Sequence, residues 1–343
     1  MRSRSRYPAG VHRSLAVLIA VLLSVAAVAC GDGGSDRLTV YSGRTENLIG
    51  PLLDEFSEET GIGIDVRYGN SADLALLISE EGDRSPADVF ISQSPGAVGF
   101  LAEQDLLATV DAEVLELVDP EFAAADGSWV GLSGRVRVLV YNTDLVDPDD
   151  LPSSVLDLVD DEFAGQVAVA PTNGSFQDFV TAMRGELGEE ETLAWLEGMA
   201  DNGSPVYANN TAIVEAVGRG EVPMGLVNHY YNVRALVEDP STPSENHHFD
   251  ATDIGSLTIV TAAGILASSS QPEQAAELIE FLLSEPAQRY FVEETQEYAL
   301  AAGVESPDLP PLDALAVGTV DLDALGGGLE DTRELIRQSG IER

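Results

Sequence analysis

The sequence contains no lysine and only one cysteine, Cys30, and both shortages restrict what the protein can do. Its 17 basic residues are all arginine and face 59 acidic residues, which gives a formal net charge of −42. A chain this acidic lacks the basic surface that binding to phosphate backbones requires, so nucleic acids are excluded as partners. A single cysteine also excludes an internal disulfide, a cysteine-based zinc site and a catalytic thiol in the body of the chain.

The short motifs of common enzyme classes are missing as well. There is no glycine-rich phosphate loop, no G-x-S-x-G elbow and no H-E-x-x-H zinc helix. Acidic residues are abundant, but no fixed pairing singles out a general acid or base, and we therefore do not expect an enzyme. The acidity itself has two interpretations, namely long-range attraction of cations or a salt-adapted or acid-biased proteome.

The first 36 residues have the features of a secretion signal followed by a tether. Four arginines precede an apolar run from Leu15 to Ala29, which is shorter than the roughly 20 residues that span a membrane. The small residues that lead into Cys30 resemble the lipobox of bacterial lipoproteins. We expect a signal peptide at 1–29, lipidation of Cys30 and a flexible tether at 30–36 that anchors the protein to the outer face of the cell membrane. The alternative is an uncleaved membrane anchor.

The body of the chain alternates between β-rich runs and helical patterns. Strands are expected at 38–41, 62–68, 87–91, 135–141, 167–170, 222–227 and 257–263, and helices at 48–60, 74–81, 176–187, 190–199, 211–219 and 272–283. Gly61 and Gly82 are expected to end the first two helices. Such alternation predicts parallel α/β sheets.

Two α/β series joined by two long extended segments predict two lobes that are linked by two crossings. We expect the first lobe at 37–135 and 258–343 and the second at 136–257. Ligands of open α/β sheets bind at the carboxyl ends of the strands, so the expected site is a cleft between the lobes.

Tyr230 and Tyr231 follow directly on the expected strand at 222–227. Neighbouring side chains of a strand point to opposite faces, so two adjacent residues can share a ligand only beyond the strand end. Oxygen donors suit hard cations. A phenol has a pKa near 10 and gives up its proton to a bound metal, so metal affinity falls as the pH drops. The alternative is one tyrosine in the core and one at the surface.

Five stretches together resemble the periplasmic ferric-ion-binding proteins of ABC iron importers. They are VYSGR at 40–44, EEGDRSPADVF at 80–90, LSGRVR at 132–137, PTNGSF at 171–176 and NHYY at 228–231. The resemblance extends through about Gly303. It implies a two-lobed α/β fold, the type II periplasmic-binding-protein fold, and a monomeric lipoprotein that carries Fe³⁺ to a membrane permease.

The resemblance also implies a set of site residues. Tyr230 and Tyr231 would be phenolate ligands of Fe³⁺, and a synergistic anion such as carbonate or phosphate would complete the iron shell. The implied anion contacts are Asn173, Gly174, Ser175, Asn210, Asn228, Ser94 and Arg135. The first three precede an expected helix, whose N-terminus favours anions. Asn210, beside Asn209, has the simpler alternative of capping the next helix.

At two positions the sequence departs from the family pattern. Thr45 and Gln93 stand where members often place histidine and glutamate, and both are weaker candidate ligands. His229 is expected to support the site, and His247 with His248 to lie in a polar surface loop at 241–253. These departures keep open a second interpretation, in which the same fold and transport role serve a phosphonate, an oxyanion or a polyamine.

Overall fold

The computed structural model describes residues 37–250, 252–301, 303–306, 309, 311 and 328–342. The predicted signal peptide, Cys30 and the tether lie outside these residues, so cleavage and lipidation stay predictions. No helix within the described ranges has both the length and the apolar character that a membrane span needs. The compact unit that carries the fold begins at Leu38.

One half of this unit alternates strands and helices as predicted. It contains β1 (Arg37–Ser42), α2 (Glu46–Thr60), β2 (Gly63–Tyr68), α3 (Ser71–Glu81), β3 (Val89–Ser92), α4 (Pro95–Ala102), β4 (Leu107–Ala108), α5 (Ala112–Leu115), α10 (Pro272–Leu282), α11 (Glu285–Glu293) and β10 (Tyr298–Ala299). Gly61 ends α2 in the left-handed conformation, which costs glycine little, and Gly82 ends α3.

The other half repeats the alternation. It contains β6 (Val167–Ala168), α6 (Gly174–Leu187), α7 (Glu189–Asp201), α8 (Asn210–Gly218), β7 (Met224–Asn228), α9 (His229–Glu238), β8 (Ser244–His247) and α12 (Leu329–Ser339). Short 3-10 helices in the two halves lie at Gly82–Arg84, Pro120–Phe122, Pro148–Asp150, Val155–Val159, Asp161–Phe163 and Ile254–Ser256.

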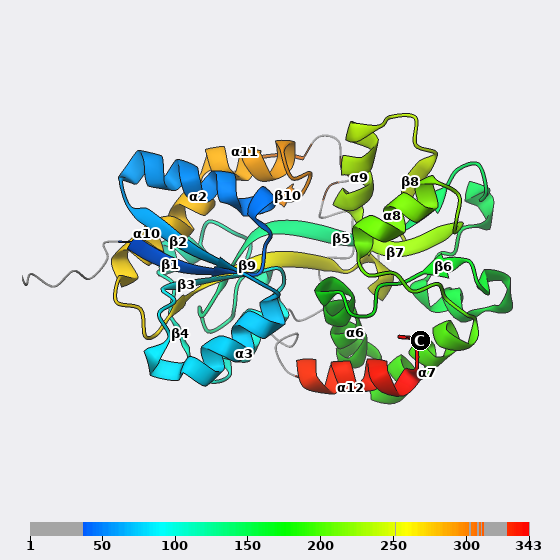
Figure 1. Ribbon diagram of the computed structural model, residues 1–343, viewed down its shortest axis with the longest axis horizontal. Coiled ribbons are helices and arrows are strands. Elements are labelled where there is room, and N and C mark those ends of the chain that lie inside the picture. The colour runs from blue at the N-terminus through cyan, green and yellow to red at the C-terminus, as the bar shows by residue number, and fades with distance from the viewer. Residues whose placement is uncertain are drawn as a thin grey trace, which may run out of the picture. The chain divides into compact units, whose positions relative to one another are not determined.

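Two long strands, β5 (Val130–Asn142) and β9 (Thr258–Leu266), run from one half to the other (Figure 1). The strand order is β2-β1-β3-β9-β5-β7-β6. Residues 130–136 of β5 pair with β9, and residues 137–142 pair with β7 and β8.

The prediction of parallel sheets is wrong for the centre of the molecule. β1 and β3 are parallel, as are β6 and β7, but β5 is antiparallel to β7, β8 and β9. The chain leaves the first half along β5 and returns along β9, so these two strands must run in opposite directions. The alternation of strands and helices reports only the parallel β-α-β units within each half.

Two further segments differ from the predictions. The segment at 241–253, expected to be a surface loop, contains β8, which pairs with β5. The sequence of β8 is polar and lacks the apolar alternation that predicts a strand. Helix α12, which the prediction placed in the first lobe with 258–343, contacts α6 and α7 and buries Leu335 and Ile336 in the core of the second half. The other lobe boundaries stay predictions.

Each half has its own hydrophobic core, and this arrangement positions the site. Phe56, Phe90 and Trp129 belong to the core of the first half, and Phe179 and Trp195 to that of the second. Burial of such aromatic side chains stabilises each half by several kcal/mol per cluster, at roughly 25 cal/mol for each Å² of apolar surface. Between the two cores, β5 carries two buried cations, Arg135 and Arg137.

Candidate ligand-binding site

A cavity of about 270 Å³ lies between the two halves, where β1, β3 and β7 end. It is lined by all the predicted ligands and anion contacts except Asn210. The first half supplies Thr45, Gln93 and Ser94, and the long strand β5 supplies Arg135. The second half supplies Asn173, Gly174, Ser175, Asn228, Tyr230 and Tyr231. Residues that are far apart in the sequence therefore meet around one space.

The two tyrosines lie just beyond the end of a strand, as their position in the sequence predicted. β7 ends at Asn228, and Tyr230 and Tyr231 stand in the first turn of α9. Their rings stack with centroids 4.1 Å apart. Burial, and then the neighbouring Tyr231, raise the pKa of Tyr230 well above its ordinary value of 10. The Tyr230 phenol therefore keeps its proton until a positive charge enters the cavity.

The ring of His229 holds the start of α9 in place through two contacts with the backbone. Its Nδ1 accepts a hydrogen bond from the Val136 N–H at 3.1 Å, and its Nε2 lies 2.9 Å from the carbonyl oxygen of Gln296. Only the tautomer with the proton on Nε2 satisfies both partners. Burial lowers the pKa of His229 to about 4. Both ring nitrogens are engaged, so His229 positions the tyrosines and is not available as a ligand.

The predicted anion loop forms the N-terminus of α6. Asn173 caps this helix, because its Oδ1 accepts hydrogen bonds from the Ser175 N–H at 3.1 Å and the Ser175 hydroxyl at 2.6 Å. Asn210 is buried and donates to Ser175 Oγ at 3.3 Å, from behind the loop. The residue that caps α8 is Asn209, which accepts from the Ala212 N–H. Capping thus explains Asn209 and leaves Asn210 to support the loop.

The two weaker candidates have different surroundings. Gln93 is held by arginines, since its Oε1 accepts from Arg44 at 3.3 Å and from Arg135 at 3.4 Å, and its carbonyl oxygen accepts a further bond from Arg135. Thr45 is exposed and donates to Asn47 at 2.6 Å. The Gln93 side chain is therefore oriented by cations, which weakens it further as a ligand for a metal.

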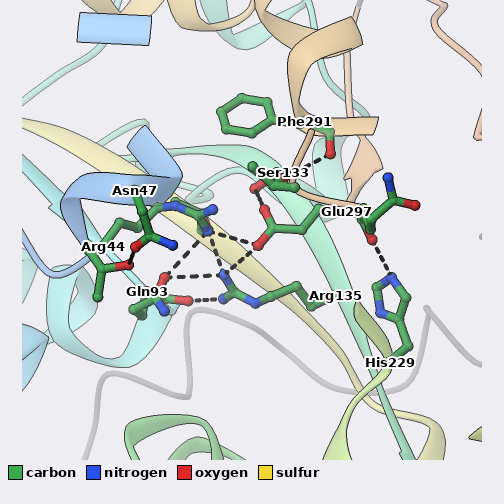
Figure 2. Close-up of polar contacts among 12 residues, drawn as sticks. Arg44, Asn47, Gln93, Ser133, Arg135, His229, Phe291 and Glu297 are labelled. Atoms are coloured by element: carbon green, nitrogen blue, oxygen red, sulfur yellow. Dashed lines mark hydrogen bonds and ion pairs between the residues drawn. The ribbon is translucent and has the colours of Figure 1, made fainter. Parts of the chain in front are cut away.

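A buried charge cluster that the sequence did not reveal supports these residues (Figure 2). The Glu297 carboxylate accepts from Arg44 at 3.0 Å and from the Ser133 hydroxyl at 2.6 Å, and lies 3.8 Å from Arg135. Burial raises the pKa of Glu297, but the two arginines outweigh it and hold that pKa below its ordinary value. Two cations and one anion leave net positive charge beside the cavity.

A second carboxylate, Asp178, faces the cavity from α6. It is 4% exposed, and burial raises its pKa to about 6, although a Ser94 hydrogen bond and the charges of Arg135 and Arg137 oppose this. Arg137 is also buried. It packs over the ring of Phe179 at 5.4 Å and donates to Asn228 Oδ1 at 3.3 Å. Burial lowers the pKa of Arg137 to about 10.

Neither carboxylate could be located from the sequence, because each lies in a helix or loop without a motif. The available signal was indirect. Arg135 and Arg137 alternate with apolar residues on an expected strand, and buried cations require nearby anions. The described part of the chain holds no group of three or more His, Cys, Asp or Glu suited to a metal.

Comparisons with known proteins decide the family. The model of a family described as bacterial extracellular solute-binding protein matches residues 84–321. An Fe(3+)-binding periplasmic protein of Serratia marcescens is 31% identical over 328 residues, which are 94% of this chain and 96% of that protein. The chain belongs to the periplasmic ferric-ion-binding protein family. The major ferric iron-binding protein of Neisseria meningitidis serogroup B is 32% identical over 331 residues, 95% of this chain and 98% of that protein.

Solved structures of this family share the fold. Iron-bound HitA from Pseudomonas aeruginosa superposes with a TM-score of 0.84 at 35% identity, over 89% of this chain and 99% of that one. Apo ferric ion-binding protein A from Pasteurella haemolytica has a TM-score of 0.79 at 26% identity, over 90% and 99%. The protein has the type II periplasmic-binding-protein fold, as predicted.

Proposed function

We propose that this protein captures ferric iron in the cavity between its halves and delivers it to the membrane permease of an ABC importer. The observation that carries the proposal is the pair of stacked phenols, Tyr230 and Tyr231, set at a strand–helix junction on the wall of a polar cavity. Fe³⁺ is a hard, highly charged ion, and phenolate oxygens are hard anionic donors. No enzymatic role is part of the proposal.

Iron binding would release protons from the phenols of Tyr230 and Tyr231. The incoming cation displaces the phenol protons, which the raised pKa of Tyr230 otherwise retains. A co-bound anion such as carbonate or phosphate would then rest against the start of α6 at Asn173–Ser175 and against Arg135. Because protons compete with the metal for the phenolates, iron affinity falls as the pH drops.

Delivery would follow closure of the two halves over the ligand. The cavity is lined from both halves, so a ligand there favours the arrangement in which both make contact. We further propose that the protein acts as a monomer tethered outside the cell by lipid on Cys30, as the sequence around that residue predicts.

The alternative ligands fit the cavity less well. A polyamine calls for several carboxylates, whereas among the described lining residues Asp178 is the only one. Arg135 and the N-terminus of α6 could bind a phosphonate or a simple oxyanion, but such a ligand does not require two adjacent phenols.

The test is a visible absorption titration of the metal-stripped protein with a ferric chelate, in the presence and absence of carbonate or phosphate. We expect a phenolate-to-iron charge-transfer band that is lost or strongly weakened in Tyr230→Phe and in Tyr231→Phe. Tyr207→Phe, outside the cavity lining, is the matched control and should keep the band. A spectrum without such a band would rule out direct ferric binding.

A further inference from the structure

We propose that Asp178 selects the anion bound beside the metal, by accepting a hydrogen bond from a protonated oxyanion such as hydrogen phosphate or hydrogen carbonate and disfavouring a fully ionised one such as sulfate. This inference rests on the proposed function, because it concerns the anion that accompanies iron. It assigns Asp178 a role in specificity and not in holding the metal.

The first support is the position of the Asp178 side chain. It lies in the second turn of α6, one turn beyond the loop at Asn173–Ser175, and it lines the same cavity. It is 4% exposed, and its Oδ2 has no hydrogen-bond partner among the residues that the structure describes. A buried carboxylate oxygen without a donor is unfavourable, so the site lacks a hydrogen-bond donor that a ligand can supply.

The second support is the set of donors around this carboxylate. Arg135 lines the cavity, is 1% exposed, and its Nε has no partner among the described residues. The charges of Arg135 and Arg137 both act on Asp178. Buried cationic donors with free N–H groups, next to the N-terminus of α6, favour an anion at this place. The cavity therefore offers an oxyanion both hydrogen-bond donors and the Asp178 carboxylate, which is the only carboxylate among the described residues that line it.

The third support is the contact of Asp178 with the opposite half. A hydrogen bond with Ser94, at the start of α4, acts on the Asp178 carboxylate. The carboxylate is therefore oriented when the two halves meet.

The chemistry that follows is simple. An ionised carboxylate only accepts hydrogen bonds. At neutral pH, phosphate and hydrogen carbonate each carry a proton that they can donate to Asp178, whereas sulfate carries none. Sulfate would place its own acceptor against the Asp178 acceptor inside a buried site. A buried acceptor left without a donor weakens binding by about 10-fold to 100-fold.

The experiment measures the apparent affinity of the ferric-loaded protein for each anion at pH 7.5, from the change of the charge-transfer band. The anions are phosphate, hydrogen carbonate, sulfate and monofluorophosphate, which has the shape of hydrogen phosphate but no proton to donate. We expect the wild-type protein to bind phosphate at least about 10-fold more tightly than sulfate or monofluorophosphate. In Asp178→Asn, whose amide can donate, the preference should shrink to about twofold or less, and Asp144→Asn on the surface should keep it.

The outcomes separate the two proposals. Equal affinities in the wild-type protein, or an unchanged preference in Asp178→Asn, would overturn the role of Asp178 while leaving ferric binding intact. A missing band with every anion would instead overturn the proposed function. If Asp178→Asn does not fold, the comparison of phosphate with monofluorophosphate in the wild-type protein still decides the question.

Discussion

His229 should make the stability of the metal-free protein depend on pH. In the folded protein its pKa is lowered from 6.5 to about 4, because it is buried, while Arg135 and His248 lower it further and Glu297 opposes. The unfolded chain therefore binds a proton at this residue between pH 6.5 and 4, whereas the folded chain does not. The stability that His229 contributes is complete above pH 6.5 and is lost as the pH falls.

The size of this effect follows from the two pKa values. At pH 4.5 the unfolded histidine is almost fully protonated and the folded one is still mostly neutral. The free energy of unfolding should therefore fall by about 2.5 kcal/mol between pH 7.5 and 4.5 on account of His229 alone. Other groups contribute their own dependence, and Asp178, whose pKa is raised to about 6, acts in the opposite direction over part of this range.

A variant isolates the contribution. His229→Gln keeps polar atoms near Val136 and Gln296 but does not titrate. Urea unfolding of both proteins, followed by circular dichroism at several pH values, should show the variant about 1–2 kcal/mol less stable at pH 7.5, because two hydrogen bonds are disturbed. The difference between the two proteins should shrink or reverse at pH 4.5. If the free energies of unfolding of the two proteins changed with pH in the same way, the account of His229 as a buried neutral residue would be refuted.

Two further changes test the packing around the site. Glu297→Gln should lower the free energy of unfolding by about 3–5 kcal/mol in urea, because it removes the carboxylate paired with buried Arg44 and one of the two carboxylates that act on buried Arg135. A loss below about 1 kcal/mol would contradict the cluster in Figure 2. Gly225→Ala should cost about 1–3 kcal/mol in thermal unfolding, because its Cβ would lie 2.2 Å from Ile213 Cγ2, whereas Gly185→Ala, whose Cβ meets nothing, should be neutral or stabilising.

The sequence predicts most of the helices and strands in each half because their signals are local. Gly61 and Gly82 end helices through their own backbone freedom, and the apolar periodicity of a helix lies within a few turns. The placement of Tyr230 and Tyr231 beyond a strand end is predicted for the same reason.

What the sequence cannot predict depends on contacts between distant segments. The antiparallel pairing of β5 with β9 joins residues more than a hundred positions apart, and β8 is a polar strand whose pairing with β5 leaves no apolar pattern. The same holds for the site. Glu297 matters because Arg44 and Arg135 reach it, and Asp178 because α6 turns it toward the cavity. Neither residue type nor spacing reports such partners.

The most direct test of ferric binding is an anomalous difference map at the iron absorption edge, from crystals of the iron-loaded protein. The account predicts a single strong peak in the cavity, within coordination distance of the phenolic oxygens of both Tyr230 and Tyr231. A peak elsewhere, or no peak in a protein that has retained iron in solution, would contradict the assignment of these tyrosines as the ferric ligands.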